Sequence, residues 1–167
     1  MSKLIDVVIE IPYNSFVKYE YDENFNKIRC DRILNTAMLY PGNYGYIPNT
    51  IAGDGDPLDI LMICEYPIYP SVVVETKVIG VLIMEDEKGL DEKLIVVPSS
   101  SVDKNYKNIN ELEDLPRLTL EKIKHFFKHY KDNDDGKWCV VREYKDSEYA
   151  LNLIRKYYNS NKRIKLM

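Results

Sequence analysis

The chain has little cysteine and histidine. Its three cysteines, Cys30, Cys64 and Cys139, are far apart in the sequence and form no Cys-x-x-Cys pair. This argues against a zinc ribbon or a redox dithiol and indicates reduced thiols of a cytosolic protein. The two histidines, His125 and His129, are four residues apart, but no glutamate stands between them as in a zinc-protease motif. Neither residue type therefore predicts a soft-metal or thiol site.

Long apolar runs and an excess of positive charge are also missing. No stretch approaches the ~18 apolar residues of a membrane-spanning helix, and the first residues do not form the apolar segment of a signal peptide. The formal net charge of -4 argues against non-specific binding to nucleic acid or to a membrane. We therefore expect a cytoplasmic protein in which residues 1–167 form a single domain around one core.

Short segments with strand character fill most of the first hundred residues. Their alternating or β-branched patterns, separated by turn-like stretches, are typical of a barrel or a sandwich. The predicted strands, including one late in the chain, are Leu4–Ile11, Phe16–Tyr21, Lys27–Leu34, Leu58–Cys64, Val72–Met84, Leu94–Val97 and Trp138–Glu143.

Helical periodicity appears only in the last third of the chain. Apolar residues such as Ile123 and Phe127 recur at helical spacing after Pro116, which is a suitable helix start. Asp146 or Ser147 could cap a second helix. Strands followed by helices predict an α+β domain, with a small closed barrel and helices packed outside it.

A cluster of carboxylates carries the clearest functional signal. Asp54, Asp56 and Asp59 lie within six residues, in a segment with two glycines, a proline and no basic residue. Because the carboxylates repel one another, divalent cations are the natural compensation, and oxygen ligands favour Mg²⁺, Mn²⁺ or Ca²⁺ over a soft metal. An EF-hand does not fit, since Leu58 and Asp59 occupy loop positions 5 and 6, where an acceptor and a glycine are required.

Further acids and several donors accompany this cluster. Taken alone, the acid-rich residues 85–93 predict a charged hairpin turn, and Glu10 and Glu20 each stand at a strand end. Many carboxylates together with Arg, Lys and Tyr donors match a metal–phosphate site, in which cations bridge phosphate oxygens. The candidate donors are Lys18, Arg32, Tyr40, Tyr44, Tyr130 and Lys131.

Taken in order, these blocks resemble the soluble family I inorganic pyrophosphatases, and most closely the short bacterial form. The segment Asp54–Asp59 fits the family signature D-[SGDN]-D-[PE]-[LIVMF]-D at every position. The resemblance extends nearly from end to end. The other matching blocks are residues 8–12, 18–20, 31–32 and 40–46, then Asp86, Asp91 and Lys93, and finally residues 129–132 and 136–138.

The resemblance implies a fold, a reaction and an assembly. The fold is a five-stranded, OB-like barrel with flanking helices. The reaction is hydrolysis of inorganic pyrophosphate to two phosphates, by direct attack of a metal-activated water. Several Mg²⁺ ions per active site are implied, with Mn²⁺ or Zn²⁺ as substitutes. The bacterial members suggest a homohexamer, in which His125 and His129 would lie at a subunit contact.

The resemblance also implies residue roles. Asp54, Asp59 and Asp91 would hold the first metal, Asp59 would be shared with a second, and Asp86 and Asp91 would hold a metal that enters with the substrate. Asp56 would accept the proton of the attacking water. The phosphate-binding donors would be Lys18, Arg32, Tyr44, Tyr130 and Lys131. The remaining residues at the site would be Glu10, Glu20, Tyr40, Lys93 and Lys137.

Three other functions stay open on the residues alone. A nucleic-acid-binding barrel should interleave basic and aromatic residues on its strands, whereas the strand ends here are acidic. A catalytically silent calcium-binding protein would not need Arg32, Lys131 and the tyrosine-rich segment together. A hydrolase of nucleotides or polyphosphate would use the same chemistry as a pyrophosphatase. Phosphate release from pyrophosphate, compared with ATP, separates these alternatives.

Overall fold

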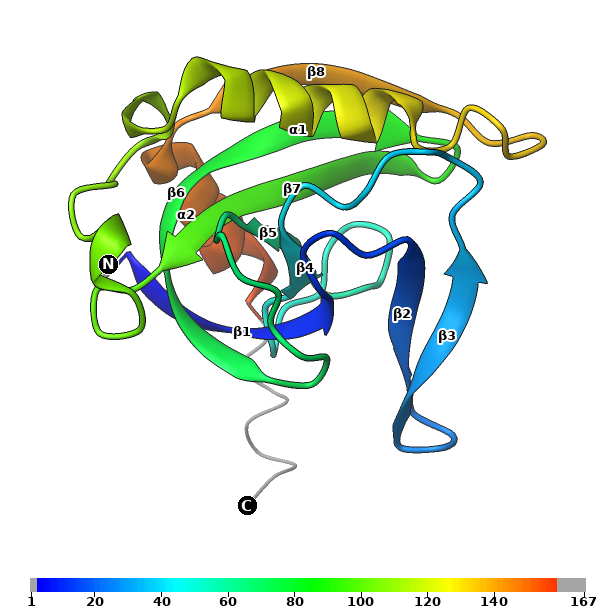
Figure 1. Ribbon diagram of the computed structural model, residues 1–167, viewed down its shortest axis with the longest axis horizontal. Helices are drawn as coiled ribbons and strands as arrows, with labels where there is room; N and C mark the ends of the chain where they lie inside the picture. Colours follow the sequence, from blue (N-terminus) through cyan, green and yellow to red (C-terminus); the bar gives the residue numbers. More distant parts are fainter. Residues whose placement is uncertain (1–2, 159–167) are drawn as a thin grey trace.

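The computed structural model describes residues 3–158, which form a six-stranded sheet, a separate hairpin and two α-helices (Figure 1). The strands are β1 (Leu4–Ile11), β2 (Val17–Asp22), β3 (Lys27–Ile33), β4 (Asn43–Tyr46), β5 (Asp59–Met62), β6 (Val73–Asp86), β7 (Gly89–Pro98) and β8 (Cys139–Lys145). The helices are α1 (Arg117–His129) and α2 (Ser147–Tyr157), with single 3-10 turns at η1 (Lys104–Tyr106) and η2 (Leu112–Asp114).

Hydrogen bonds link five of the strands in a ring. The order is β1-β4-β5-β7-β6, and β6 pairs back onto β1, while β8 extends the sheet beyond β6. In this sheet the pairing of β5 with β7 is parallel and the other pairs are antiparallel. Strands β2 and β3 form the separate hairpin. The predicted α+β class, with five strands in a barrel-like ring and two helices in the last third, is confirmed.

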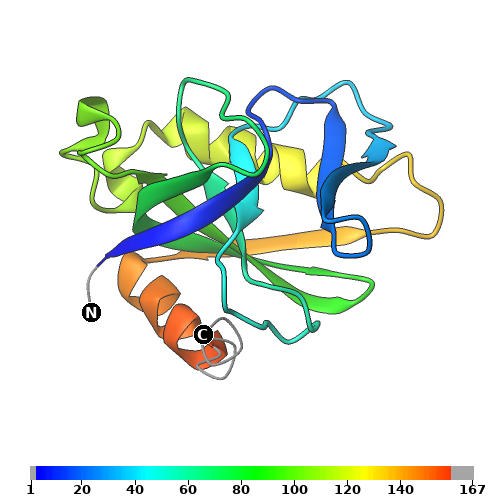
Figure 2. The same ribbon diagram turned by 90° about the horizontal axis from the view of Figure 1, so that it is seen from below.

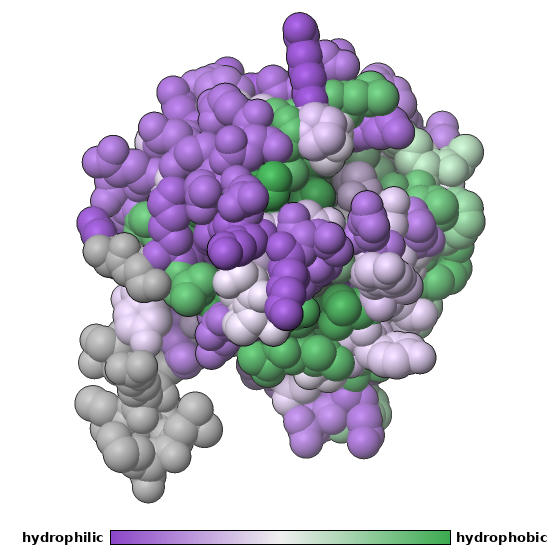
Figure 3. Space-filling view, turned by 60° about the vertical axis from the view of Figure 1, so that its left-hand side comes forward, coloured by the Kyte–Doolittle hydropathy of each residue, from purple (hydrophilic) through white to green (hydrophobic). Residues whose placement is uncertain are grey.

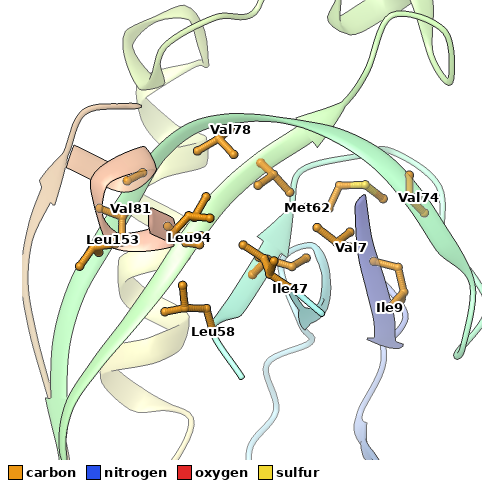
Figure 4. Packing of buried hydrophobic residues seen from close by; sticks show 14 of the residues in the cluster. Val7, Ile9, Ile47, Leu58, Met62, Val74, Val78, Val81, Leu94 and Leu153 are labelled. Carbon is orange, nitrogen blue, oxygen red and sulfur yellow. The ribbon is translucent and has the colours of Figure 1, made fainter. Parts of the chain in front are cut away.

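Strand β5 and the second half of β7 are buried on both faces, which matches their continuous apolar residues 60–62 and 94–97. On β5, Ile60 and Met62 join a core cluster that includes residues of α2, whereas Leu61 joins a second cluster that includes residues of α1. Figure 4 shows the first cluster, in which Leu153 of α2 packs near Val81 of β6. Helices α1 and α2 accordingly lie on opposite sides of the sheet (Figure 2).

Both helices begin at the residues that the sequence suggests. Pro116 precedes α1, where its fixed φ and missing N–H are tolerated. Asp146 caps α2, because its side chain accepts a hydrogen bond of 2.9 Å from the backbone N–H of Tyr149. The apolar stripe of α1, which includes Ile123 and Phe127, is buried against the sheet.

Two stretches differ from the sequence-based expectation. Residues 43–46 have turn-like composition but form strand β4, because they pair with β1 on one side and β5 on the other. Strand β7 begins at Gly89, well before the predicted Leu94, so the acid-rich segment is largely strand and only its tip is a turn. Glu92 and Lys93 are buried within β7, and hydropathy alone gives no reason to place charged residues there.

The surface is mixed in polarity. Hydrophilic side chains cover much of the face in Figure 3, with apolar side chains gathered in smaller areas between them. Such a mixture is normal for the surface of a folded domain. Over residues 3–158, no helix has the length and hydrophobicity needed to span a bilayer.

Candidate active site

One cavity of about 180 Å³ is lined by all fifteen residues that the sequence assigns to the site. The acids come from the ends of β1, β2 and β6, from the starts of β5 and β7, and from the loop before β5. The basic and hydroxyl donors come from the hairpin β2–β3, from β4 and the segment before it, from β7 and from the segment after α1. The fold thus gathers these residues from across the chain, while their individual roles remain predictions.

Lys93 lies at the centre of the acidic side of the cavity. The parallel register of β5 and β7 pairs Asp59 with Lys93, and alternation along β7 puts Asp91 on the same side as Lys93. The Nζ of Lys93 lies 2.7 Å from Oδ2 of Asp59 and 2.9 Å from Oδ1 of Asp91, and donates to the hydroxyl of Tyr44 at 2.8 Å. Burial opposes the charge, but Asp59 and the other neighbours raise the pKa of Lys93 well above its ordinary value. The lysine therefore stays charged and partly offsets the acids.

Two carboxyl groups in the cavity have raised pKa values. Burial raises the pKa of Glu10 from 4.5 to about 7, although the backbone N–H of Tyr21 donates to its Oε2 at 3.1 Å. Burial also raises the pKa of Asp91, against the opposing effect of Lys93. Because Asp59 adds to the shift in both cases, crowded acids here are costly when no further cation is bound.

Three tyrosines form much of the apolar part of the cavity wall. Burial is the main cause that raises the pKa of Tyr40, Tyr44 and Tyr130. Phe126 packs between two of them, with ring centroids 4.8 Å from Tyr40 and 5.1 Å from Tyr130. The hydroxyls thus remain protonated at neutral pH and are held by packing, so they can donate hydrogen bonds to an anion.

Each of three cationic side chains at the cavity is paired with an acid. Lys18 lies 3.2 Å from Asp31, Arg32 lies 3.2 Å from Asp134, and Lys131 lies 3.3 Å from Asp86. Even so, the acids outnumber the cations, because eight carboxyl groups and six cationic side chains line the cavity. A cation bound to Asp86 would leave Lys131 free to hold an anion.

The donor set fits hard divalent cations. Asp54 and Asp56 lie on the exposed loop before β5, where Asp54 Oδ1 accepts a hydrogen bond from the N–H of Asp56 and Gly55 has a φ of 87°. Within residues 3–158, no three His, Cys, Asp or Glu side chains are grouped so that they could hold a metal ion. The acids facing the cavity nevertheless offer only carboxylate oxygens, the ligands that Mg²⁺ prefers.

Sequence reasoning left out several residues at this site. Tyr19, Glu87 and Lys88 also line the cavity, and Glu87 lies 3.7 Å from the Nζ of Lys131. Glu87 and Lys88 directly follow Asp86 at the tip of the acid-rich hairpin. Their position beside a predicted metal ligand could have identified them as site residues. Asp134 has no comparable signal, because its partner Arg32 is 102 residues away in the chain.

Replacing Glu10 with glutamine should change how stability depends on pH when metal is removed. The folded state keeps a proton that the unfolded chain releases between pH 4.5 and about 7, so the wild type loses stability as pH rises through this window. Glu10→Gln avoids this loss, and should be about 1–3 kcal/mol more stable than wild type at pH 8. Urea unfolding with chelator should show this difference shrinking towards pH 5. An equal difference at both pH values would contradict the burial of this carboxyl.

Comparison with known proteins gives a consistent result. A family model described as inorganic pyrophosphatase matches residues 7–162. The inorganic pyrophosphatase of Campylobacter jejuni is 51% identical over 152 residues, which cover 91% of this chain and 88% of that protein. A solved inorganic phosphatase from Anaplasma phagocytophilum is 46% identical with a TM-score of 0.90, covering 93% of this chain and 92% of that one. The inorganic pyrophosphatase structure from Helicobacter pylori is 41% identical with a TM-score of 0.91 and the same coverage. The chain therefore belongs to the inorganic pyrophosphatase family, as a family I protein of the short bacterial type.

Proposed function

We propose that this chain hydrolyses inorganic pyrophosphate to two phosphates, in a reaction that depends on several Mg²⁺ ions. Membership of the inorganic pyrophosphatase family supports the reaction. The observation that carries the proposal is a single cavity in which crowded carboxylates face Lys, Arg and Tyr donors. Such a pairing suits a substrate that is itself a metal–phosphate complex.

The carboxylates divide between metal binding and proton transfer in this proposal. Asp54, Asp59 and Asp91 would hold the first metal, with Asp59 shared with a second, and Asp86 and Asp91 would hold a further ion. When bound, Mg²⁺ lowers the pKa of water and neutralises charge on the leaving phosphate, and Mn²⁺ or Zn²⁺ could substitute for it. Asp56 would accept a proton from the attacking water, since its loop leaves the carboxylate exposed beside the cavity.

The remaining residues bind and orient the two phosphate groups. Lys18 and Arg32 approach from the hairpin, and Tyr130 and Lys131 approach from the segment after α1. Tyr44 would donate its hydroxyl proton to a phosphate oxygen, because its own oxygen already accepts from Lys93. Phosphoryl transfer requires positioning and charge neutralisation more than covalent chemistry, and these donors supply the positioning. Glu10, Glu20, Tyr40 and Lys137 would complete the walls.

Purified protein should release phosphate from pyrophosphate with Mg²⁺ and be inactive with chelator. With Ca²⁺ the rate should be low, because the larger ion relaxes the geometry that in-line attack requires. The assay compares pyrophosphate, ATP and no substrate at equal Mg²⁺. Equal rates on ATP and pyrophosphate would overturn the substrate assignment.

We also propose that the protein is cytoplasmic and assembles as a homohexamer through the exposed side of α1. A groove of about 670 Å³ runs beside this helix and is lined by His125, Phe126 and Tyr40 among others. Light scattering at neutral pH should give about six times the chain mass, and His125→Glu should shift the protein to smaller species by placing a charge in the contact. A wild-type monomer at micromolar concentration would contradict this assembly.

A further inference from the structure

Asp134 joins two walls of the cavity that are distant in sequence. It lies between α1 and β8, in the segment that also carries Lys131 and Lys137, whereas Arg32 lies near the end of β3. Nη1 of Arg32 donates to Oδ2 of Asp134 at 3.2 Å, and Nδ2 of Asn35 donates to Oδ1 at 2.8 Å. Figures 1 and 2 both show the loop after α1 beside the segment that follows β3. One carboxylate thus holds the cavity-lining side chain of Arg32 together with that of Asn35.

This ion pair is sheltered from solvent. The side chains of Asp134 and Arg32 are 9% and 24% exposed, whereas those of the surface pair Arg117–Glu121 are 92% and 55% exposed. Exposed pairs are screened and constrain geometry weakly. A sheltered charge-assisted bond is stronger and more directional, so it can fix the plane of a guanidinium.

Arg32 also keeps a donor that protein atoms do not satisfy. Its Nε is buried and has no hydrogen-bond partner within the described part of the chain, although the side chain lines the cavity. A buried N–H without an acceptor costs free energy, and such groups in folded proteins are usually paired. Because Nε is enclosed, an anion in the cavity would be bound through the outer nitrogens of the guanidinium. With Nη1 bound to Asp134, the plane of these nitrogens is fixed before the anion arrives.

We propose that Asp134 is a positioning residue that orients Arg32 for a phosphate group of the substrate. Asp134 acts through Arg32, and Asn133 supports the arrangement by donating from Nδ2 to the backbone oxygen of Asn35 at 2.8 Å. The tie also keeps Arg32 at a fixed separation from Lys131 on the opposite wall. This inference rests on the proposed function, in which both residues bind phosphate.

The test is steady-state kinetics on pyrophosphate with Mg²⁺, using Asp134→Asn and the neighbouring Asp135→Asn as a matched control. Asp135 is exposed and lies one residue further along the same loop. Asp134→Asn should raise KM about tenfold and change kcat less than about threefold. The reason is that a misoriented Arg32 weakens the binding of the ground state and of the transition state to the same extent. Asp135→Asn should leave both unchanged. Asn35→Ala, which removes the bond to the other oxygen of Asp134, should raise KM less.

A double-mutant cycle then separates positioning from a merely structural role. In an Arg32→Ala background, adding Asp134→Asn should change KM less than about twofold, since the residue it positions is already absent. Equal effects of Asp134→Asn with and without Arg32 would overturn the inference. So would a lowered unfolding temperature with KM unchanged. If the wild type hydrolyses pyrophosphate and Asp134→Asn has the same KM and kcat, this inference alone is refuted. If the wild type does not hydrolyse pyrophosphate, the proposed function is refuted and this inference with it.

Discussion

Replacing Asp56 with asparagine is expected to lower kcat about 10²–10⁴-fold. Asparagine has the same shape, so the exposed loop should keep its conformation, including the bond from the residue-56 N–H to Asp54 Oδ1. Its amide cannot accept a proton from water, so the reaction loses its general base. Steady-state kinetics with pyrophosphate and Mg²⁺ measures the loss.

The comparison that decides the role of Asp56 is metal affinity. Asp59→Asn removes a proposed shared ligand, which also lies 2.7 Å from Lys93, and should weaken Mg²⁺ binding more than Asp56→Asn does. Calorimetric Mg²⁺ titration of both variants gives the two affinities, with Asp135→Asn as a control on exposed loop charge. A larger affinity loss for Asp56→Asn would reassign Asp56 as a metal ligand.

The candidate site could be predicted from sequence because its residues fall in short, ordered blocks. Three acids in the segment Asp54–Asp59 already suggest cations, and the fold brings the distant acid Asp91 and the donor Lys131 to the same cavity. Contacts between side chains far apart in the chain have no such local signal. The ion pair between Arg32 and Asp134 forms where the loop after α1 contacts the end of the hairpin β2–β3. It therefore exists only in the folded chain.

The strands were predictable where the apolar pattern is strong and missed where tertiary pairing overrides composition. Strand β1 has clear alternation, whereas β4 consists of Asn, Gly and two Tyr residues and reads as a turn. Its place in the ring comes from hydrogen bonds to β1 and β5. At Gly45, which pairs with Ile9, the backbones of β4 and β1 come very close together.

Replacing Gly45 with alanine is expected to destabilise the fold by about 2–4 kcal/mol. An added Cβ would lie 1.9 Å from the backbone oxygen of Val8 and 3.0 Å from Cα of Ile9. Because these are backbone atoms of β1, relief requires the two strands to separate, which strains the ring. For a chain of this size the unfolding temperature should fall by about 4–16 °C, measured by thermal unfolding with chelator.

Gly53→Ala is the matched control for that substitution. A Cβ at Gly53 meets no atom within 4 Å. The unfolding temperature of this variant should therefore differ from that of the wild type by no more than about 2–4 °C, in either direction. The two substitutions add the same methyl group at glycines eight residues apart, so their difference isolates the close approach of β4 to β1. Equal unfolding temperatures for both variants would mean that β1 and β4 can separate at little cost. The absence of a side chain at residue 45 would then have no structural role in closing the ring.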